Sequence, residues 1–248
     1  MGPIRHYHNV VKPNAPLDDS PTRDAKLTIA ALLKKASSGG YLRPVTSRSA
    51  LWKPPRMLSF LTAAVRGDPT VPLLLRPVDP LTAQHLDLWR FAQYYTERDS
   101  QDYSAAEPSP GHGATIVLDG VQRVTALNIT VHGVYAQRRD LSRWHRPDAY
   151  PEQRVYLNLL DDLPGGGPEF RFLAALETLP SAHEPGRWYP VIWALQDSGS
   201  PGQALAHLER HNLAGSRRAC ERVLLLWEAL HIRRTVDIVH HPDVPSMR

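Results

Sequence analysis

Apolar residues recur with helical spacing in several segments of the chain, and form short runs or alternate in others. Helices are predicted over four segments: 24–36, 54–66, 82–95 and 120–135. Two more helices are predicted to begin at Ser200 and Ser216. Strands are predicted over five segments: 41–45, 71–75, 115–118, 236–239 and the hairpin 154–174, which turns at its three glycines. This mixture predicts an α+β fold with a small sheet.

The polar segments suggest how the chain is organised. Residues 1–24 are polar and contain prolines, so we expect a flexible arm there. Residues 98–113 are rich in turn formers and predict a surface loop that could act as a lid. We expect a core over 25–137, a β-hairpin and helical extension over 138–240, and a tail over 241–248.

Composition limits the function classes only mildly. The 248 residues include 29 Lys+Arg and 25 Asp+Glu, a net charge of +4 that permits nucleic-acid binding without demanding it. Cys220 is the single cysteine, so an internal disulfide and a thiolate zinc site are excluded. We find neither a signal-peptide pattern nor an apolar run of the ~20 residues that a membrane span needs. A cytoplasmic protein without a membrane partner is expected.

The most specific local pattern lies around Asp119. A buried strand runs into Asp119-Gly120, and a helix follows at once. A helix N-terminus presents unpaired N–H groups and a positive dipole, so it can bind an anion. Arg123 would add a charged donor, and Asp119 could hold a metal-bound water or a ribose hydroxyl. The alternative is structural, because Asp119 and Gln122 also have the spacing of a helix capping box.

This stretch also resembles a known family signature. Leu-Asp-Gly-x-Gln-Arg-x-Thr-x-Leu is similar to the L-D-G-Q-Q-R-L-T-x-L signature of the GmrSD restriction endonuclease N-terminal domain family. Seven positions match: Leu118, Asp119, Gly120, Gln122, Arg123, Thr125 and Leu127. Val121 stands where the family has Gln. The resemblance implies a ParB/sulfiredoxin-like mixed sheet with packed helices.

Upstream segments continue the resemblance in order. The family's Q-R-x-Y-x-W and G-x-P-x-G motifs are matched at four positions: Arg48, Trp52, Gly67 and Pro69. Ser47 and Ala50 replace the first motif's Gln and aromatic residue. The resemblance therefore leads us to expect Arg48, Trp52 and Arg123 to approach a common cleft.

Downstream the resemblance is carried by strands, and one family segment is missing. Residues 150–160 resemble the Y-L-N-L-L strand of one family branch, and 170–173 resemble its F-R-F-L strand. The likeness covers roughly residues 25–240. The family's later F-x-R-x-N-x-G-G segment is not found, although Arg210 to Gly215 has a related spacing. Nor is an HNH-type nuclease domain recognised.

The resemblance implies the nucleotide-binding component of a restriction-like bacterial defence system against phage DNA, working with a separate nuclease subunit. The expected ligand is a nucleoside triphosphate, with Mg²⁺ held at Asp119. No cluster of side chains in the sequence indicates a separate metal site. The nucleotide site would comprise Arg48, Asp119, Gly120, Val121, Gln122, Arg123 and Thr125. Asp119 and Arg123 would be catalytic, although the altered motifs predict weak or no hydrolysis. The alternative is a non-catalytic or truncated relic that binds DNA or a protein.

Other chemistry-bearing residues are weaker candidates. Arg138, Arg139, Arg143 and Trp144 could contact DNA, with Trp144 stacking on a base; the alternatives are a solvated loop and, for Trp144, a place in the core. The terminal histidines are expected to be solvated rather than metal ligands: His6, His8, His240 and His241. Cys220 lies on an apolar helix face and is expected in the core.

Overall fold

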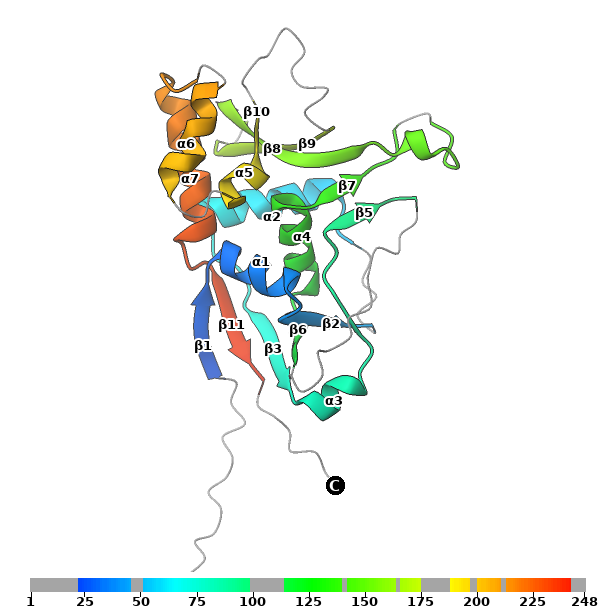
Figure 1. Cartoon of the computed structure of the whole chain (residues 1–248). Helices are drawn as coiled ribbons and strands as arrows, with labels where there is room; N and C mark the ends of the chain where they lie inside the picture. The colour runs from blue at the N-terminus through cyan, green and yellow to red at the C-terminus, as the bar shows by residue number, and fades with distance from the viewer. Residues whose placement is uncertain are drawn as a thin grey trace, which may run out of the picture.

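Two β-sheets with helices between them make up the fold of the computed structural model (Figure 1). The structure describes residues 22–45, 51–98, 114–139, 142–163, 166–174, 188–196, 200–210 and 213–241. These residues form two mixed sheets, of six and five strands, and seven α-helices. The predicted α+β class is confirmed, and the sheet content is larger than the one small sheet expected.

The six-stranded sheet has the order β1-β11-β3-β6-β2-β4. Its strands are β1 (Thr22–Leu27), β2 (Tyr41–Pro44), β3 (Leu73–Val78), β4 (Leu88–Trp89), β6 (Ala114–Asp119) and β11 (Val236–His240). Two neighbouring pairs are parallel, β11 with β3 and β2 with β6. Because β2 and β6 are parallel, with Tyr41 opposite Thr115, their carboxyl ends lie at the same edge of the sheet.

The five-stranded sheet is built around the long strand β8. Its strands are β5 (Tyr94–Thr96), β7 (Val134–Ala136), β8 (Glu152–Asp162), β9 (Pro168–Ala174) and β10 (Trp188–Pro190). β9 pairs with β8 as the antiparallel hairpin that was predicted over 154–174. β7 and β10 pair with β8 at its first residues and its middle, respectively, and β5 is parallel to β7.

The helices join the two sheets through one continuous core. They are α1 (Ile29–Ser37), α2 (Pro54–Arg66), α3 (Pro80–Gln84), α4 (Val121–Val131), α5 (Val191–Gln196), α6 (Pro201–Arg210) and α7 (Arg217–His231), with a 3₁₀ turn η1 (Pro147–Ala149). α1, α2 and α4 lie between the sheets (Figure 1). The main core contains Leu75 and Val117 from the first sheet, Leu127 from α4, and Val155 and Leu157 from the second.

Several helix ends follow the predicted signals. α2 begins at Pro54 and ends at Gly67, whose φ of 83° is the left-handed conformation that glycine accepts best. α7 begins after Ser216, whose side chain accepts a hydrogen bond from the Ala219 N–H at 3.3 Å. The predicted strand over 236–239 is β11, which lies between β1 and β3 in the first sheet.

The helix predicted over 24–36 begins too early. Residues up to Leu27 form β1, and α1 begins only after Thr28, whose hydroxyl accepts from the Ala31 N–H at 3.1 Å. β1 pairs antiparallel with β11, and the ion pair between Lys26 and Asp237 spans 3.3 Å. Pairing with a strand more than 200 residues away therefore overrides the local helical spacing.

The helix predicted over 82–95 is also largely wrong. α3 ends at Gln84, and the following residues form β4 and β5. β4 pairs with β2, and β5 pairs with β7. Leu88 is buried in a small second core with Leu42 and Ile116, so its apolar character serves sheet packing rather than a helix.

Two further boundaries differ from the prediction. The strand predicted over 71–75 is β3, which begins at Leu73; Val71 lies before it and is 68% exposed. The helix predicted to reach 135 ends at Val131, and Val134 and Tyr135 belong to β7. The chain turns at Gly133, where a Cβ would collide with the Gln93 carbonyl oxygen. Close approach of two backbones thus ends α4 early.

Some expectations fall on residues that the structure does not describe. Most of the expected arm, the expected lid from 99 onward and all but the first residue of the expected tail lie outside the described residues. The division into a core and an extension stays a prediction. Among the described residues, no helix is both long and apolar enough to span a membrane.

Candidate functional site

The strand-to-helix turn predicted at Asp119 is present in the structure. Asp119 is the last residue of β6, and Gly120 is the N-cap of α4 with a φ of 95°. A Cβ at Gly120 would collide with Leu73 Cδ2 and lie 3.0 Å from Arg123 Nη2. Glycine is therefore required both for the backbone conformation and for the close packing of β3 beneath the turn. The amino end of α4 follows directly, with its positive dipole end at the edge of the sheet.

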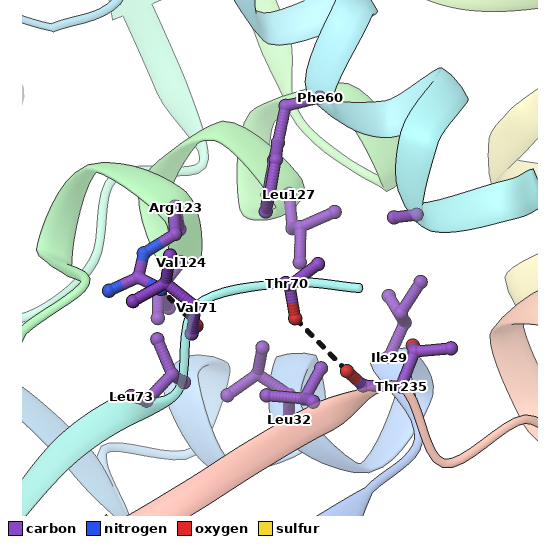
Figure 2. A pocket seen from close by; sticks show the side chains of 12 residues that line it. Ile29, Leu32, Phe60, Thr70, Val71, Leu73, Arg123, Val124, Leu127 and Thr235 are labelled. Atoms are coloured by element: carbon purple, nitrogen blue, oxygen red, sulfur yellow. Dashed lines mark hydrogen bonds between the residues drawn. The ribbon is translucent and has the colours of Figure 1, made fainter. Parts of the chain in front are cut away.

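Arg123 lies under this turn and is largely engaged by the protein. Its Nη2 donates to Asp119 Oδ2 at 2.8 Å and to the Pro72 carbonyl at 3.2 Å, and its Nη1 donates to the Val71 carbonyl. Its side chain is 14% exposed, whereas that of Asp119 is 66% exposed. Figure 2 shows the guanidinium beside Val71. Arg123 thus holds the two residues before β3 against the turn. Asp119 is the charged group that faces solvent.

The capping-box interpretation is wrong in its geometry. The N-cap is Gly120, one residue later than the box requires, and no side chain caps the helix there. Asp119 instead pairs with Arg123, and Gln122 Oε1 accepts a hydrogen bond from the Trp52 backbone N–H at 3.2 Å. Asp119 therefore makes a local contact with Arg123, Gln122 makes a long-range contact with Trp52, and neither side chain caps the helix.

These contacts bring together three segments that are far apart in the sequence. Trp52 contacts Gln122, and the Val71 and Pro72 carbonyls contact Arg123. The Trp52 ring packs edge-on against Phe60, with centroids 5.5 Å apart. The Trp52 backbone thus lies against the first turn of α4, whereas the Arg123 guanidinium contacts Val71 and Pro72, so a cleft common to Trp52 and Arg123 stays a prediction. Arg48 lies outside the described residues, so its part in a common cleft stays a prediction.

The remaining predicted positions in α4 face inward. Thr125 is 1% exposed, and its hydroxyl donates to the Val121 carbonyl at 2.8 Å within the helix. The Val121 side chain is buried in the main core. Neither side chain reaches the surface where a ligand could approach. The backbone N–H groups at the start of α4 could still bind a ligand, because every non-proline residue supplies one. Thr125 is therefore better explained by helix packing than by ligand contact.

An apolar cavity lies on the inner side of Arg123 (Figure 2). It is enclosed by α1, α2, α4 and the segment before β3, and its volume is about 20 Å³. The Thr70 hydroxyl closes one side by donating to the Thr235 carbonyl at 3.1 Å. Such a volume holds about one water molecule, so a nucleotide cannot bind there. A nucleotide at this turn must approach from the side of Asp119.

Two larger hollows lie away from the turn. One of about 500 Å³ lies between α2 and the β8–β9 hairpin and includes Arg66 and Asp68. The other, of about 350 Å³, is lined by α1, α5, α7 and the end of α4, and includes His132. His132 Nε2 and Ser37 Oγ are 3.5 Å apart. Burial, with a smaller contribution from Arg154, lowers the pKa of His132. His132 has no signature in the sequence, because a lone histidine at a helix end forms no pattern.

The basic and aromatic residues predicted as a DNA contact are exposed. Arg138, Arg139 and Arg143 are exposed in the segment between β7 and β8, and Trp144 is 70% exposed. A core position for Trp144 is therefore wrong. Cys220 instead packs partly buried against the main core, as predicted.

Asp119 is the acidic side chain through which this turn could ligate a cation. Among the described residues, no three His, Cys, Asp or Glu side chains gather as a metal cluster. Asp119 supplies one exposed carboxylate, and Mg²⁺ is commonly held by one or two carboxylates plus phosphate oxygens and water. The residues present therefore fit a metal–nucleotide complex better than a resident metal. Comparison with models of known protein families gives no match for this chain, and comparison with curated proteins gives none either.

Proposed function

We propose that this chain is a nucleotide-binding component of a restriction-like DNA defence system, of the GmrSD N-terminal domain type. The observation that supports the proposal best is the convergence of the three segments that carry the resemblance. The Trp52 segment contacts Gln122, and the segment after Gly67 and Pro69 contacts Arg123. A ParB/sulfiredoxin-like fold is part of the proposal, and so are a separate nuclease subunit and DNA as partners.

The nucleotide would bind as its magnesium complex at the turn between β6 and α4. Without a cation, the Asp119 carboxylate repels a phosphate and already holds Arg123 at 2.8 Å. Asp119 would hold the Mg²⁺ of such a complex, and the ion's charge would offset the repulsion between carboxylate and phosphate. The N–H groups at the start of α4 and the Arg123 charge then favour the phosphate oxygens. Nucleotide affinity should therefore depend on Mg²⁺.

Isothermal titration calorimetry of the full chain tests this function. ATP, GTP, CTP and UTP are titrated separately, each in the presence of Mg²⁺ and again with EDTA. At least one triphosphate should bind in Mg²⁺ and bind at least tenfold more weakly in EDTA. Failure of all four nucleotides to bind in Mg²⁺ would contradict the proposal.

A non-catalytic binding module is the second candidate. It is favoured by the contacts of Arg123 and Thr125, whose donors are engaged by the protein's own carbonyl groups. In phosphoryl transfer the protein contributes mainly positioning and charge neutralisation, and a donor already engaged contributes less to both. Nucleotide binding without turnover, or binding of DNA or a protein alone, would be the activity in that case.

A further inference from the structure

The segment between β7 and β8 presents an exposed tryptophan among basic residues. Residues 137–150 contain four arginines and one histidine against two aspartates. The Trp144 side chain is 70% exposed, although a ring of this size loses considerable free energy by facing water. Arg138, Arg139 and Arg143 are also exposed. An exposed aromatic ring in a positive setting is typical of an interaction surface.

The backbone around Trp144 is held in place by the protein. The Arg139 N–H donates to the Ala149 carbonyl at 2.8 Å, and the Ala149 N–H donates to the Arg146 carbonyl at 3.1 Å. The Tyr150 hydroxyl donates to the Trp144 carbonyl at 2.8 Å. Ala149 itself is 3% exposed and anchors the 3₁₀ turn. Binding at residues 142–150 would therefore need little additional ordering of the backbone.

The charges around the ring leave a small positive excess. Arg146 pairs with Asp148 through two hydrogen bonds, of 3.0 and 2.7 Å, so these two charges largely cancel. Glu97 is a nearby carboxylate, and it accepts from the Tyr135 hydroxyl at 3.1 Å and from the Arg138 backbone N–H at 3.0 Å. Counted over the sequence, the four arginines exceed Asp140, Asp148 and Glu97 by one positive charge.

We infer that the surface formed by Arg138, Arg139, Arg143, Trp144 and His145, here called the Trp144 surface, binds single-stranded nucleic acid. Trp144 would stack on one base, and the arginines would neutralise the phosphates on either side. A single strand fits better than a duplex, because duplex bases are already stacked and must be unstacked before a ring can cover them. The inference does not depend on the nucleotide site at Asp119.

Salt dependence and ring substitution provide two independent readouts. Three neutralised phosphates on a single strand predict a slope of log affinity against log salt of about −2. Base–aromatic stacking predicts that Trp144→Ala weakens binding by about tenfold or more. Trp144→Phe keeps an aromatic face and should stay within about threefold of the wild type. Because Trp144 is 70% exposed, neither change should unfold the chain.

Fluorescence anisotropy of the full chain with labelled oligodeoxythymidine tests the inference, using strands of twelve nucleotides at low salt. Arg143→Ala should weaken binding and make the salt slope shallower by about 0.7. Arg217→Ala is the matched control, because Arg217 is 92% exposed on α7 and is absent from the Trp144 surface. This control removes the same charge and should leave the affinity within about twofold of the wild type.

Four outcomes would overturn the inference. The first is no binding at low salt, and the second is binding that Trp144→Ala leaves unchanged. The third is tighter binding to a duplex of the same length than to the single strand. The fourth is binding to vesicles of phosphatidylserine without binding to the oligonucleotide, which would indicate a membrane-interface tryptophan instead.

Discussion

The backbone N–H of Trp52 donates to Oε1 of Gln122 at 3.2 Å across 70 positions of sequence. This bond joins the residues just before α2 to the first turn of α4, beside the turn that contains Asp119. Arg123 makes the adjacent connection to the carbonyls of Val71 and Pro72. The side chains that follow Gly120 therefore shape the candidate site by holding distant backbone segments against it.

Substitution of Gln122 by Ala should destabilise the chain measurably. The partly buried Trp52 N–H would lose its acceptor, which costs about 1 kcal/mol in the free energy of unfolding. Urea unfolding followed by circular dichroism provides the measurement. Gln203→Ala, on the exposed face of α6, is the control and should stay within about 0.5 kcal/mol of the wild type. Equal stability of the two variants would show that the bond contributes nothing.

Gly120→Ala should be far more damaging than Gly166→Ala. Both glycines have positive φ, 95° and 81°, so each substitution carries a backbone cost of about 1–2 kcal/mol. Only at Gly120 does the new Cβ collide with Leu73, because nothing lies within 4 Å of a Cβ at Gly166. We expect the free energy of unfolding to fall by at least about 2 kcal/mol more in Gly120→Ala than in Gly166→Ala, measured by thermal or urea unfolding. Similar losses at both sites would contradict close packing under the turn.

His132 should contribute to destabilisation by acid. Its pKa is lowered in the folded chain by burial and by Arg154, so the folded state binds a proton less readily than the unfolded state. Above the ordinary pKa of about 6.5 both states are neutral, and stability is unaffected. As the pH falls below about 6.5, only the unfolded state gains this proton, and the folded state loses relative stability.

His132→Gln should therefore show a smaller loss of melting temperature between pH 7.5 and 5.5 than the wild type. Lys34 and His231 line the same hollow and stay unchanged in this comparison. His145→Gln removes an exposed ring instead and is expected to keep the wild-type loss. A His132→Gln variant with the full wild-type loss would contradict the assignment.

Nucleotide hydrolysis by the isolated chain should be close to background. Val121 replaces a polar residue of the family signature, and the protein's own carbonyls engage the Arg123 guanidinium. Loss of one donor from a preorganised site typically lowers the rate ~10²–10³-fold. Steady-state phosphate release is the measurement, with Asp119→Ala and Arg123→Ala alongside. Rapid release that either substitution abolishes would contradict this expectation and support a complete catalytic site.

Local signals predicted the parts of the fold that local physics determines. Pro54 and Gly67 bound α2 because proline suits a first helical turn and glycine accepts positive φ. The break after β6 was predicted because an apolar run ends at Asp119-Gly120. By contrast, β1, β4 and β5 were missed because their conformation depends on pairing with β11, β2 and β7. Short strands stabilised by distant partners leave little periodicity in the sequence.

The candidate site was predictable in position but not in its contacts. The sequence placed Asp119, Gly120 and Arg123 together at one helix start, which the structure bears out. The sequence did not indicate that the Arg123 guanidinium would donate to the Val71 and Pro72 carbonyls, because backbone acceptors have no sequence signature. Nor did the sequence decide whether Trp144 is buried or exposed, since a single aromatic ring in a polar segment is compatible with both positions.

Titration of magnesium nucleotide into Asp119→Asn and Asp148→Asn tests the central claim most directly. Both carboxylates are 66% exposed, and each pairs with an arginine, at 2.8 Å for Asp119 and 2.7 Å for Asp148. With Mg²⁺ present, the Asp119→Asn affinity should fall at least tenfold, while in EDTA it should equal or exceed that of the wild type. Asp148→Asn should bind like the wild type in both conditions. Wild-type affinity of Asp119→Asn in Mg²⁺ would contradict a nucleotide site at this turn.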